Sequence, residues 1–206
     1  LPETYFTVWS NLFDIGGAKA GDTILVHGGT SGIGVAAIDL GRQFGLDVIV
    51  TCGTDAKCAA AEGFGARAIN YRNGDFAPVV REMTGGAGVD IVLDMVGGDY
   101  VGRNLACLKQ DGRHISIAFL GGSRVEFDMG IVMRRRLHMT GSTLRPRPLA
   151  EKAAIAGRLR THVWPALAAG ALKPRVDRLF PLEEAPAAHR RMEAGEHVGK
   201  IVLTLA

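Results

Sequence analysis

The sequence predicts an α/β fold in which a doubly wound, parallel sheet of six strands carries helices on both faces. Short apolar runs rich in β-branched residues alternate with segments of helical periodicity as far as Thr143. Such alternation requires right-handed crossovers between parallel strands. A glycine-rich turn directly after the first apolar run is the second observation. The 206 residues, 47% of them hydrophobic, are enough to bury the core of such a domain.

The chain begins with a predicted helix over Glu3–Ile15, which has one strongly apolar face and ends at Gly16-Gly17. The alternation then runs through predicted strands and the helices between them. The strands are Thr23–His27, Asp47–Thr51, Ala68–Asn70, Asp90–Asp94, Arg113–Phe119 and Leu137–Thr143. The helices are Gly32–Phe44, Asp55–Glu62, Phe76–Thr84, Tyr100–Lys109 and Met129–Arg135.

The glycine-rich turn, Gly28-Gly29-Thr30-Ser31-Gly32-Ile33-Gly34, joins the first strand to its helix. Glycines let the backbone turn tightly and let a pyrophosphate approach, while the helix N-terminus presents free N–H groups and a positive dipole end. Ser31 or Thr30 can cap this helix. We therefore expect a dinucleotide phosphate to be bound here by Thr30, Ser31, Gly32 and Ile33.

The glycine spacing alone leaves two readings open. Gly28-x-x-x-Gly32-x-Gly34 also resembles the turn of short-chain dehydrogenases, a family that places a Tyr-x-x-x-Lys pair downstream. In this chain Tyr71 is followed four residues later by Asp75, and Tyr100 by Asn104. The missing pair counts strongly against the short-chain reading.

The last part of the chain, residues 148–206, has a different pattern from residues 1–147, which we assign to the dinucleotide-binding domain. Helices are predicted over Leu149–Val163, Pro165–Ala169 and Glu183–Ala194, and strands over Arg175–Pro181 and Gly199–Leu205. This segment is small for an independent domain. We expect it to complete a catalytic domain that is mostly missing, because Leu1-Pro2-Glu3-Thr4 reads as the middle of a longer protein.

Composition favours a cytoplasmic protein and argues against several other classes. The net charge is only +3, and Arg134-Arg135-Arg136 reads as a solvated helix end, so nucleic-acid binding is not expected. No apolar run reaches the roughly 18 residues of a membrane span, and no signal peptide is evident. Cys52, Cys58 and Cys107 fit a reducing compartment, and neither they nor the six histidines show zinc-ligand spacing.

Taken in order, several motifs of the chain resemble the cofactor-binding portion of the medium-chain dehydrogenase/reductase superfamily, in particular zeta-crystallin-like NADPH:quinone oxidoreductases. They are Leu1–Trp9, Val26–Gly34, Thr51–Thr54 with Lys57, Ile69–Arg72, Leu93–Gly98 and Gly199–Leu203. The resemblance implies hydride transfer without zinc, and a GroES-like N-terminal domain that nothing in this chain matches. It also implies a homodimer paired through the sixth strand. The catalytic residues would lie largely in that unmatched domain, so the sequence identifies none of them.

The end of the second strand predicts NADPH as the cofactor. NAD-preferring sites usually carry an acid there to hold the ribose 2′-hydroxyl, but this chain reads Thr51-Cys52-Gly53-Thr54. Gly53 leaves room, while Thr54 and Lys57 suit a 2′-phosphate. We expect Asp55 to cap the following helix and point away.

Other residues at the strand ends complete the predicted site. The resemblance implies that Tyr71 flanks the adenosine phosphate, although a role in covering the sheet edge has equal weight. Nicotinamide and ribose contacts are expected from Val96, Gly97, Phe119, Leu120, Ser142, Thr143 and Leu144. For Phe119 and Leu120 a purely core role is equally consistent with the sequence.

Three functions remain open. The first is an NADPH-dependent reductase of quinones, and the second is a reductase of enoyl thioesters or enones from the same superfamily. Both take a small-molecule acceptor, and a substrate panel separates them. The third is a non-catalytic module that senses NADPH or binds RNA, and the weak basic balance argues against RNA. The isolated chain is expected to bind NADPH but to reduce an acceptor poorly.

Overall fold

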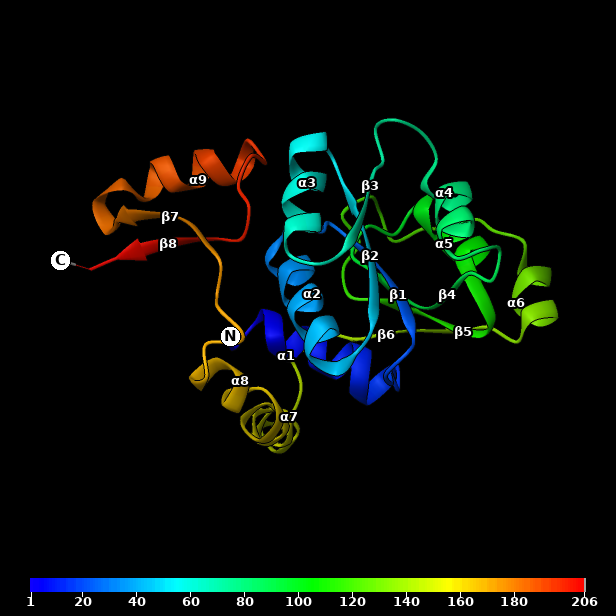
Figure 1. Ribbon diagram of the computed structural model, residues 1–206, viewed down its shortest axis with the longest axis horizontal. Coiled ribbons are helices and arrows are strands. Elements are labelled where there is room, and N and C mark those ends of the chain that lie inside the picture. Colours follow the sequence, from blue (N-terminus) through cyan, green and yellow to red (C-terminus); the bar gives the residue numbers. More distant parts are fainter. Residues whose placement is uncertain (206) are drawn as a thin grey trace.

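The computed structural model describes residues 1–205 and confirms the predicted fold (Figure 1). Six parallel strands form one sheet in the order β3-β2-β1-β4-β5-β6. Because the strand order reverses between β1 and β4, the switch point of the sheet lies there, where such folds bind ligands. The strands are β1 (Thr23–His27), β2 (Asp47–Cys52), β3 (Arg67–Asn70), β4 (Val89–Asp94), β5 (Leu108–Ser116) and β6 (His138–Gly141).

Helices cover both faces of this sheet and divide its core into two clusters. Ile24 and Val26 of β1 face one cluster, and Leu25 between them faces the other, as strand alternation requires. The first cluster packs under α1 and α2, and the second under α4 and α5. These helices and their neighbours are α1 (Thr4–Trp9), α2 (Gly32–Phe44), α3 (Asp55–Gly63), α4 (Phe76–Met83), α5 (Tyr100–Cys107) and α6 (Met129–Arg135).

The predicted N-terminal helix is present but changes its winding halfway. After α1, residues Ser10–Ile15 form a π-helix. Trp9 anchors this region, stacking on Phe13 with ring centroids 4.7 Å apart and meeting Phe44 of α2 edge-on at 5.4 Å. π-helical turns are rare and often occur at functional sites. In this chain the wider turn carries Asn11, which reaches the large cavity described below.

The boundaries of α5, β5 and β6 differ from the prediction. The predicted helix Tyr100–Lys109 ends at Cys107, and β5 already starts at Leu108, because buried Leu108 pairs with Val89. The predicted strand Arg113–Phe119 ends at Ser116, so Phe119 belongs to a loop. β6 occupies only His138–Gly141 of the predicted Leu137–Thr143.

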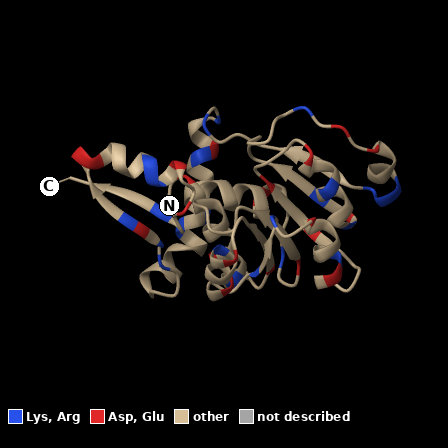
Figure 2. Cartoon of the chain, turned by 90° about the horizontal axis from the view of Figure 1, so that it is seen from above, with Lys and Arg blue, Asp and Glu red and all other residues tan. Residues whose placement is uncertain are grey.

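The basic cluster at the end of α6 is held locally by acidic and carbonyl partners. Arg134 pairs with Asp128 at 3.1 Å, and Arg136 pairs with Asp111 at 2.8 Å. Arg135 donates to two backbone carbonyls of the α5–β5 junction. Basic and acidic segments are interspersed along the chain (Figure 2).

The C-terminal part forms a second, smaller unit beside the main sheet (Figure 1). Helix α7 (Leu149–His162) packs Ile155 and Leu159 into the first core cluster, next to α1. Helix α8 (Trp164–Ala168) follows, with Pro165 in its first turn. Strands β7 (Val176–Pro181) and β8 (Lys200–Thr204) pair in parallel, joined by a 3₁₀ turn (Leu182–Glu184) and α9 (Ala185–Glu193). Ala206 lies outside the described residues. Between residues 1 and 205, no helix is both long and apolar enough to cross a membrane.

Candidate cofactor site

The glycine-rich turn has the geometry of a phosphate-binding turn. Ser31 caps α2, its hydroxyl accepting from the Gly34 amide at 3.1 Å, so Ser31 rather than Thr30 is the cap. Gly28 adopts a φ of 75°, a conformation that favours glycine. A Cβ at Gly34 would lie 2.4 Å from the Gly28 carbonyl oxygen, so α2 starts against the backbone of the turn.

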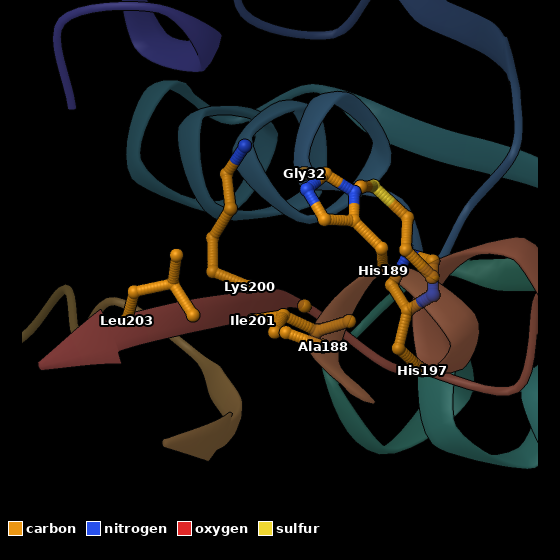
Figure 3. A pocket seen from close by; sticks show the side chains of 9 residues that line it. Gly32, Ala188, His189, His197, Lys200, Ile201 and Leu203 are labelled. Carbon is orange, nitrogen blue, oxygen red and sulfur yellow. The ribbon is translucent and has the colours of Figure 1, made fainter. Parts of the chain in front are cut away.

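Lys200, which no motif of the sequence singled out as a site residue, stands over this turn. A Cβ at Gly32 would lie 2.7 Å from the Lys200 ammonium nitrogen, and the Lys200 side chain rises from β8 toward α2 (Figure 3). The ammonium lies 3.8 Å from the carboxylate of Glu3. A backbone hydrogen bond also joins the C-terminal unit to this turn, since the Gly199 amide donates to the Thr30 carbonyl at 2.9 Å. Lys200 is thus a cation at the predicted pyrophosphate position.

The end of β2 carries the residues predicted to hold a 2′-phosphate. Thr54 caps α3 by accepting from the Lys57 amide at 3.2 Å, so the expectation that Asp55 is the cap is wrong. Asp55 instead accepts from the side chain of Asn70, the last residue of β3, at 2.6 Å. The cap suits threonine because its hydroxyl accepts here and can still donate to another group.

Lys57, in α3, and Tyr71, which follows β3, are the next two residues predicted to bind near this phosphate. The Lys57 ammonium donates to the Gly195 carbonyl in the C-terminal unit. Tyr71 is 40% exposed, and a Cβ at Gly53 would lie 2.8 Å from its hydroxyl oxygen. Glycine at position 53 therefore lets Tyr71 close over the end of β2. This contact fits both readings of Tyr71, as a neighbour of the adenosine phosphate and as a cover for the sheet edge.

The turn after β4, which contains Val96 and Gly97, is held by the buried carboxylate of Asp94. One oxygen accepts from the amides of Val96 at 2.7 Å and Gly97 at 3.1 Å, and the other lies 3.1 Å from His114 Nε2. Burial alone would raise the pKa of Asp94, but the bonds from His114 and the two amides outweigh it and lower the pKa. A buried, ionised carboxylate thus fixes the turn expected to contact the nicotinamide ribose.

Three further buried polar side chains continue this network beneath the cleft. His27 Nδ1 lies 2.9 Å from the Thr51 hydroxyl, and its Nε2 lies 2.8 Å from the Asn104 carbonyl oxygen. Burial lowers the pKa of His27 to about 4, so the ring is neutral near pH 7. Neutral His27 donates through Nε2 to Asn104 and accepts from Thr51. The network spans the C-terminal ends of the central strands.

Residues 119–122 are tied to the turn after β4 and not to the core. The Leu120 amide donates to the Met95 carbonyl at 3.1 Å, and the Gly121 amide to the Val96 carbonyl at 2.7 Å. Phe119 is 51% exposed and Leu120 is 78% exposed, so the alternative that gave both a core role is wrong. Phe119 lies against Gly97, where a Cβ would come within 2.7 Å of its ring.

A cavity of about 720 Å³ opens at the C-terminal ends of β4, β5 and β6. It brings together five of the predicted residues, namely Ile33, Leu120, Ser142, Thr143 and Leu144. It also includes residues that the sequence patterns did not reveal, namely Phe6, Thr7, Asn11, Met95, Ile117, Arg145 and Lys152. The walls are mainly apolar, with few polar groups, which is typical of small-molecule sites.

Asn11 joins the N-terminal π-helix to the loop after β6 at this cavity. It is buried, donates to the Thr7 carbonyl at 2.8 Å, and accepts from the Ser142 hydroxyl at 2.8 Å. A signal was present in the sequence, since two polar residues, Ser10 and Asn11, interrupt the apolar run Val8–Phe13. Its partner, however, is 131 residues away. Local periodicity cannot reveal such a pair.

No metal centre is formed by residues 1–205, since they contain no group of three or more His, Cys, Asp or Glu side chains placed to hold an ion. Burial raises the pKa of Cys52 and of Cys107 to about 12, which disfavours the thiolate form that zinc binds. The residues present therefore do not fit a zinc site.

Comparison with known proteins agrees with the fold. Over residues 64–203, more than half of the chain, the sequence matches the family described as zinc-binding dehydrogenase. A 2-haloacrylate reductase of a Burkholderia species is 35% identical over 195 residues, which cover 90% of this chain and 56% of that protein. A mycocerosic acid synthase-like polyketide synthase of Mycobacterium tuberculosis is 34% identical over 96% of this chain, which spans 9% of that protein.

A comparison with solved structures finds similar proteins of the same kind. CurK enoyl reductase superposes with a TM-score of 0.84 at 27% identity, covering 100% of this chain and 61% of that one. A crystal structure of 2-haloacrylate reductase gives a TM-score of 0.83 at 32% identity, covering 97% and 62%. The chain thus spans little more than half the length of the 2-haloacrylate reductase and of CurK enoyl reductase. With its glycine turn and six-stranded parallel sheet, it belongs to the zinc-binding dehydrogenase family of oxidoreductases, within the medium-chain dehydrogenase/reductase superfamily.

Proposed function

We propose that this chain is the cofactor-binding portion of a reductase that transfers hydride from NADPH to a carbon–carbon double bond conjugated with a carbonyl group. The observation that carries the proposal is the apolar 720 Å³ cavity on the strand edge that also holds the glycine turn. A dinucleotide bound to that turn would place its nicotinamide at this cavity. The named relatives, a 2-haloacrylate reductase and an enoyl reductase, act on acceptors of this kind.

Each part of the cofactor has residues that fit it. The amides of Gly32 and Ile33, with the ammonium of Lys200, suit the pyrophosphate. Thr54 and Lys57 suit the 2′-phosphate, and no acid other than Asp55, which is bonded to Asn70, lies next to them in sequence. The cofactor supplies the hydride, and the protein supplies position, electrostatics and exclusion of water. The apolar walls of the cavity serve the last purpose.

Quinone reduction is the second candidate, and the motifs quoted above favour it. A quinone is itself a conjugated enedione, so its ring carbonyls and double bonds accept hydride by the same electron flow. The enoyl-type acceptor is preferred because the relatives named for it align over nearly the whole chain. An NADPH sensor would use the same cofactor contacts but would not need the apolar cavity.

The test follows NADPH oxidation by the product of the intact gene with a matched acceptor panel. The panel contains a 2-haloacrylate, an enoyl thioester, a cyclic enone and a small quinone. Highest kcat/KM for one of the first three supports the proposal, and highest kcat/KM for the quinone supports the second candidate. Tight NADPH binding without turnover of any acceptor would favour the sensor. The isolated chain should bind NADPH but turn over poorly, because a reactive acceptor must be held about 3–3.5 Å from the hydride donor.

A further inference from the structure

The small sheet formed by β7 and β8 lies to one side of the six-stranded sheet (Figure 1). Phe180 of this small sheet is buried, whereas Val176, Leu179 and Leu203 are between 41% and 58% exposed. Burial of apolar surface is the main favourable term in packing, and here little of it is available. Polar contacts must therefore contribute much of what fixes the small sheet against the rest of the chain.

Several of these polar contacts converge on Arg175, the residue directly before β7. Its guanidinium lies 3.6 Å from the carboxylate of Asp39 in α2, and 3.8 Å above the centre of the Phe64 ring. The Arg175 carbonyl accepts from the amide of Lys200, the first residue of β8, at 2.9 Å. The preceding residue, Gly199, is the one bonded to the glycine turn. Arg175 thus joins the small sheet to α2 close to that turn.

The partner of Arg175 is a buried carboxylate that the N-terminal helix also contacts. The side chain of Asp39 is only 3% exposed, and its second oxygen accepts from the Tyr5 hydroxyl of α1 at 3.1 Å. Burial raises the pKa of Asp39, although the bond from Tyr5 and the charges of Arg175 and Arg42 oppose that rise. Arg175 is the cation within ion-pair distance of this carboxylate.

The contact between Arg175 and Asp39 is an attraction of charges without a close hydrogen bond. At 3.6 Å the two atoms are too far apart for a hydrogen bond. Arg175 Nε is buried and has no hydrogen-bond partner among residues 1–205. A cavity of about 50 Å³ lies beside the pair and extends to Gly32 of the glycine turn. A pair of this kind can open without the loss of a strong, bidentate bond.

We infer that Tyr5, Asp39 and Arg175 form a latch that holds the small sheet on the glycine turn, and that opening of this latch limits how fast the cofactor leaves. The part that concerns the cofactor rests on the proposed function. Because Lys200 of β8 stands over Gly32, a dinucleotide bound at the turn leaves faster once the small sheet has moved away.

Hydrogen exchange of the Gly199 amide tests the latch, because this amide bonds to the Thr30 carbonyl across the two units. Exchange is followed by mass spectrometry of the product of the intact gene. In Arg175→Met, the protection factor should fall about tenfold or more at about pH 8, because an unpaired buried charge is strongly unfavourable. The fall should be smaller at about pH 5, where Asp39 can take up a proton. Asp39→Asn/Arg175→Met removes both charges, so it should restore the protection and abolish the pH dependence.

Arg158→Met is the matched control, because Arg158 of α7 pairs with Asp14 at 2.8 Å in a partly exposed ion pair. This variant should leave exchange at Gly199 unchanged. Unchanged exchange at Gly199 in Arg175→Met would overturn the latch. An equal loss of protection in β1 and β4 would also overturn it, because the whole domain would then be destabilised.

The rate of NADPH release, measured by stopped flow at about pH 8, tests the link to the cofactor. Release should be about tenfold faster from Arg175→Met than from the unmodified protein, in proportion to the loss of protection, and the double variant should restore the slower rate. An unchanged rate beside faster exchange would overturn the role in cofactor release. Absence of NADPH binding by the unmodified protein would overturn the proposed function, and the exchange experiment would still decide the latch.

Discussion

Replacing Gly34 by alanine tests whether the close approach of α2 to the glycine turn sets the stability of the domain. The new methyl carbon would lie 2.4 Å from the Gly28 oxygen and 2.5 Å from the Gly29 carbonyl. These are backbone atoms, so α2 must move or the turn must open, and the Ser31 cap on the Gly34 amide weakens. Overpacking costs about 1–3 kcal/mol and a lost cap about 1 kcal/mol. The helix propensity of alanine returns about 0.5–1 kcal/mol.

The net loss expected for Gly34→Ala is therefore about 1–3.5 kcal/mol, or about 2–14 °C in Tm for a chain of this size. NADPH binding should be lost with it. Gly157→Ala in α7 is the matched control, because a Cβ there meets nothing within 4 Å, and it should stabilise by about 0.5–1 kcal/mol. Thermal and urea unfolding followed by circular dichroism measure both. A loss below about 0.5 kcal/mol for Gly34→Ala would refute the reasoning.

Four further predictions concern the cofactor, pH, assembly and metal. Lys57→Ala should weaken NADPH binding by about 1–3 kcal/mol and leave NADH nearly unchanged; equal losses in a calorimetric titration would contradict the 2′-phosphate assignment. Burial lowers the pKa of His27 to about 4. The unfolded chain binds a proton at this histidine near the ordinary pKa of about 6.5. The free energy of unfolding should therefore be highest above pH ~6.5 and should fall by about 3 kcal/mol as the pH falls toward 4. Urea midpoints should show this slope, and His27→Gln should flatten it. Two copies should pair through β6, whose four residues form an exposed edge; a monomer in light scattering at high concentration would reject this pairing. Elemental analysis should find no stoichiometric zinc in the purified chain.

The central strands and the glycine turn could be predicted from the sequence because their signals are local. Apolar β-branched runs form the buried strands, and Gly28 occupies the left-handed conformation that the turn requires. The start of β5 could not be predicted in this way. Asp111, inside β5, has a φ of 60° and pairs with Arg136, 25 residues away, so a tertiary contact holds a bend that no local pattern predicts.

In the candidate site too, residues with a local sequence signal could be predicted, and residues placed by contacts distant in the sequence could not. Ser31 was foreseen as one of two possible caps, because the residue type and its place before the helix are enough. The assignment of the next cap to Asp55 failed because Asn70, on a neighbouring strand, competes for that carboxylate. Lys200 reaches Gly32 only through the fold of the C-terminal unit. No spacing rule links residues so far apart.

In the proposed reductase, the contacts around Asp94 would make one braced turn position both the cofactor and the acceptor. Asp94 fixes the amides of Val96 and Gly97, and the carbonyls of this turn accept from residues 120 and 121. Leu120, which lines the large cavity, therefore moves with the turn expected to hold the nicotinamide ribose. A change of acceptor is then more easily made by substituting side chains such as Leu120 or Leu144 than by reshaping the loop. Reshaping the loop would also displace the hydride donor, whereas a new side chain alters only the wall that the acceptor meets.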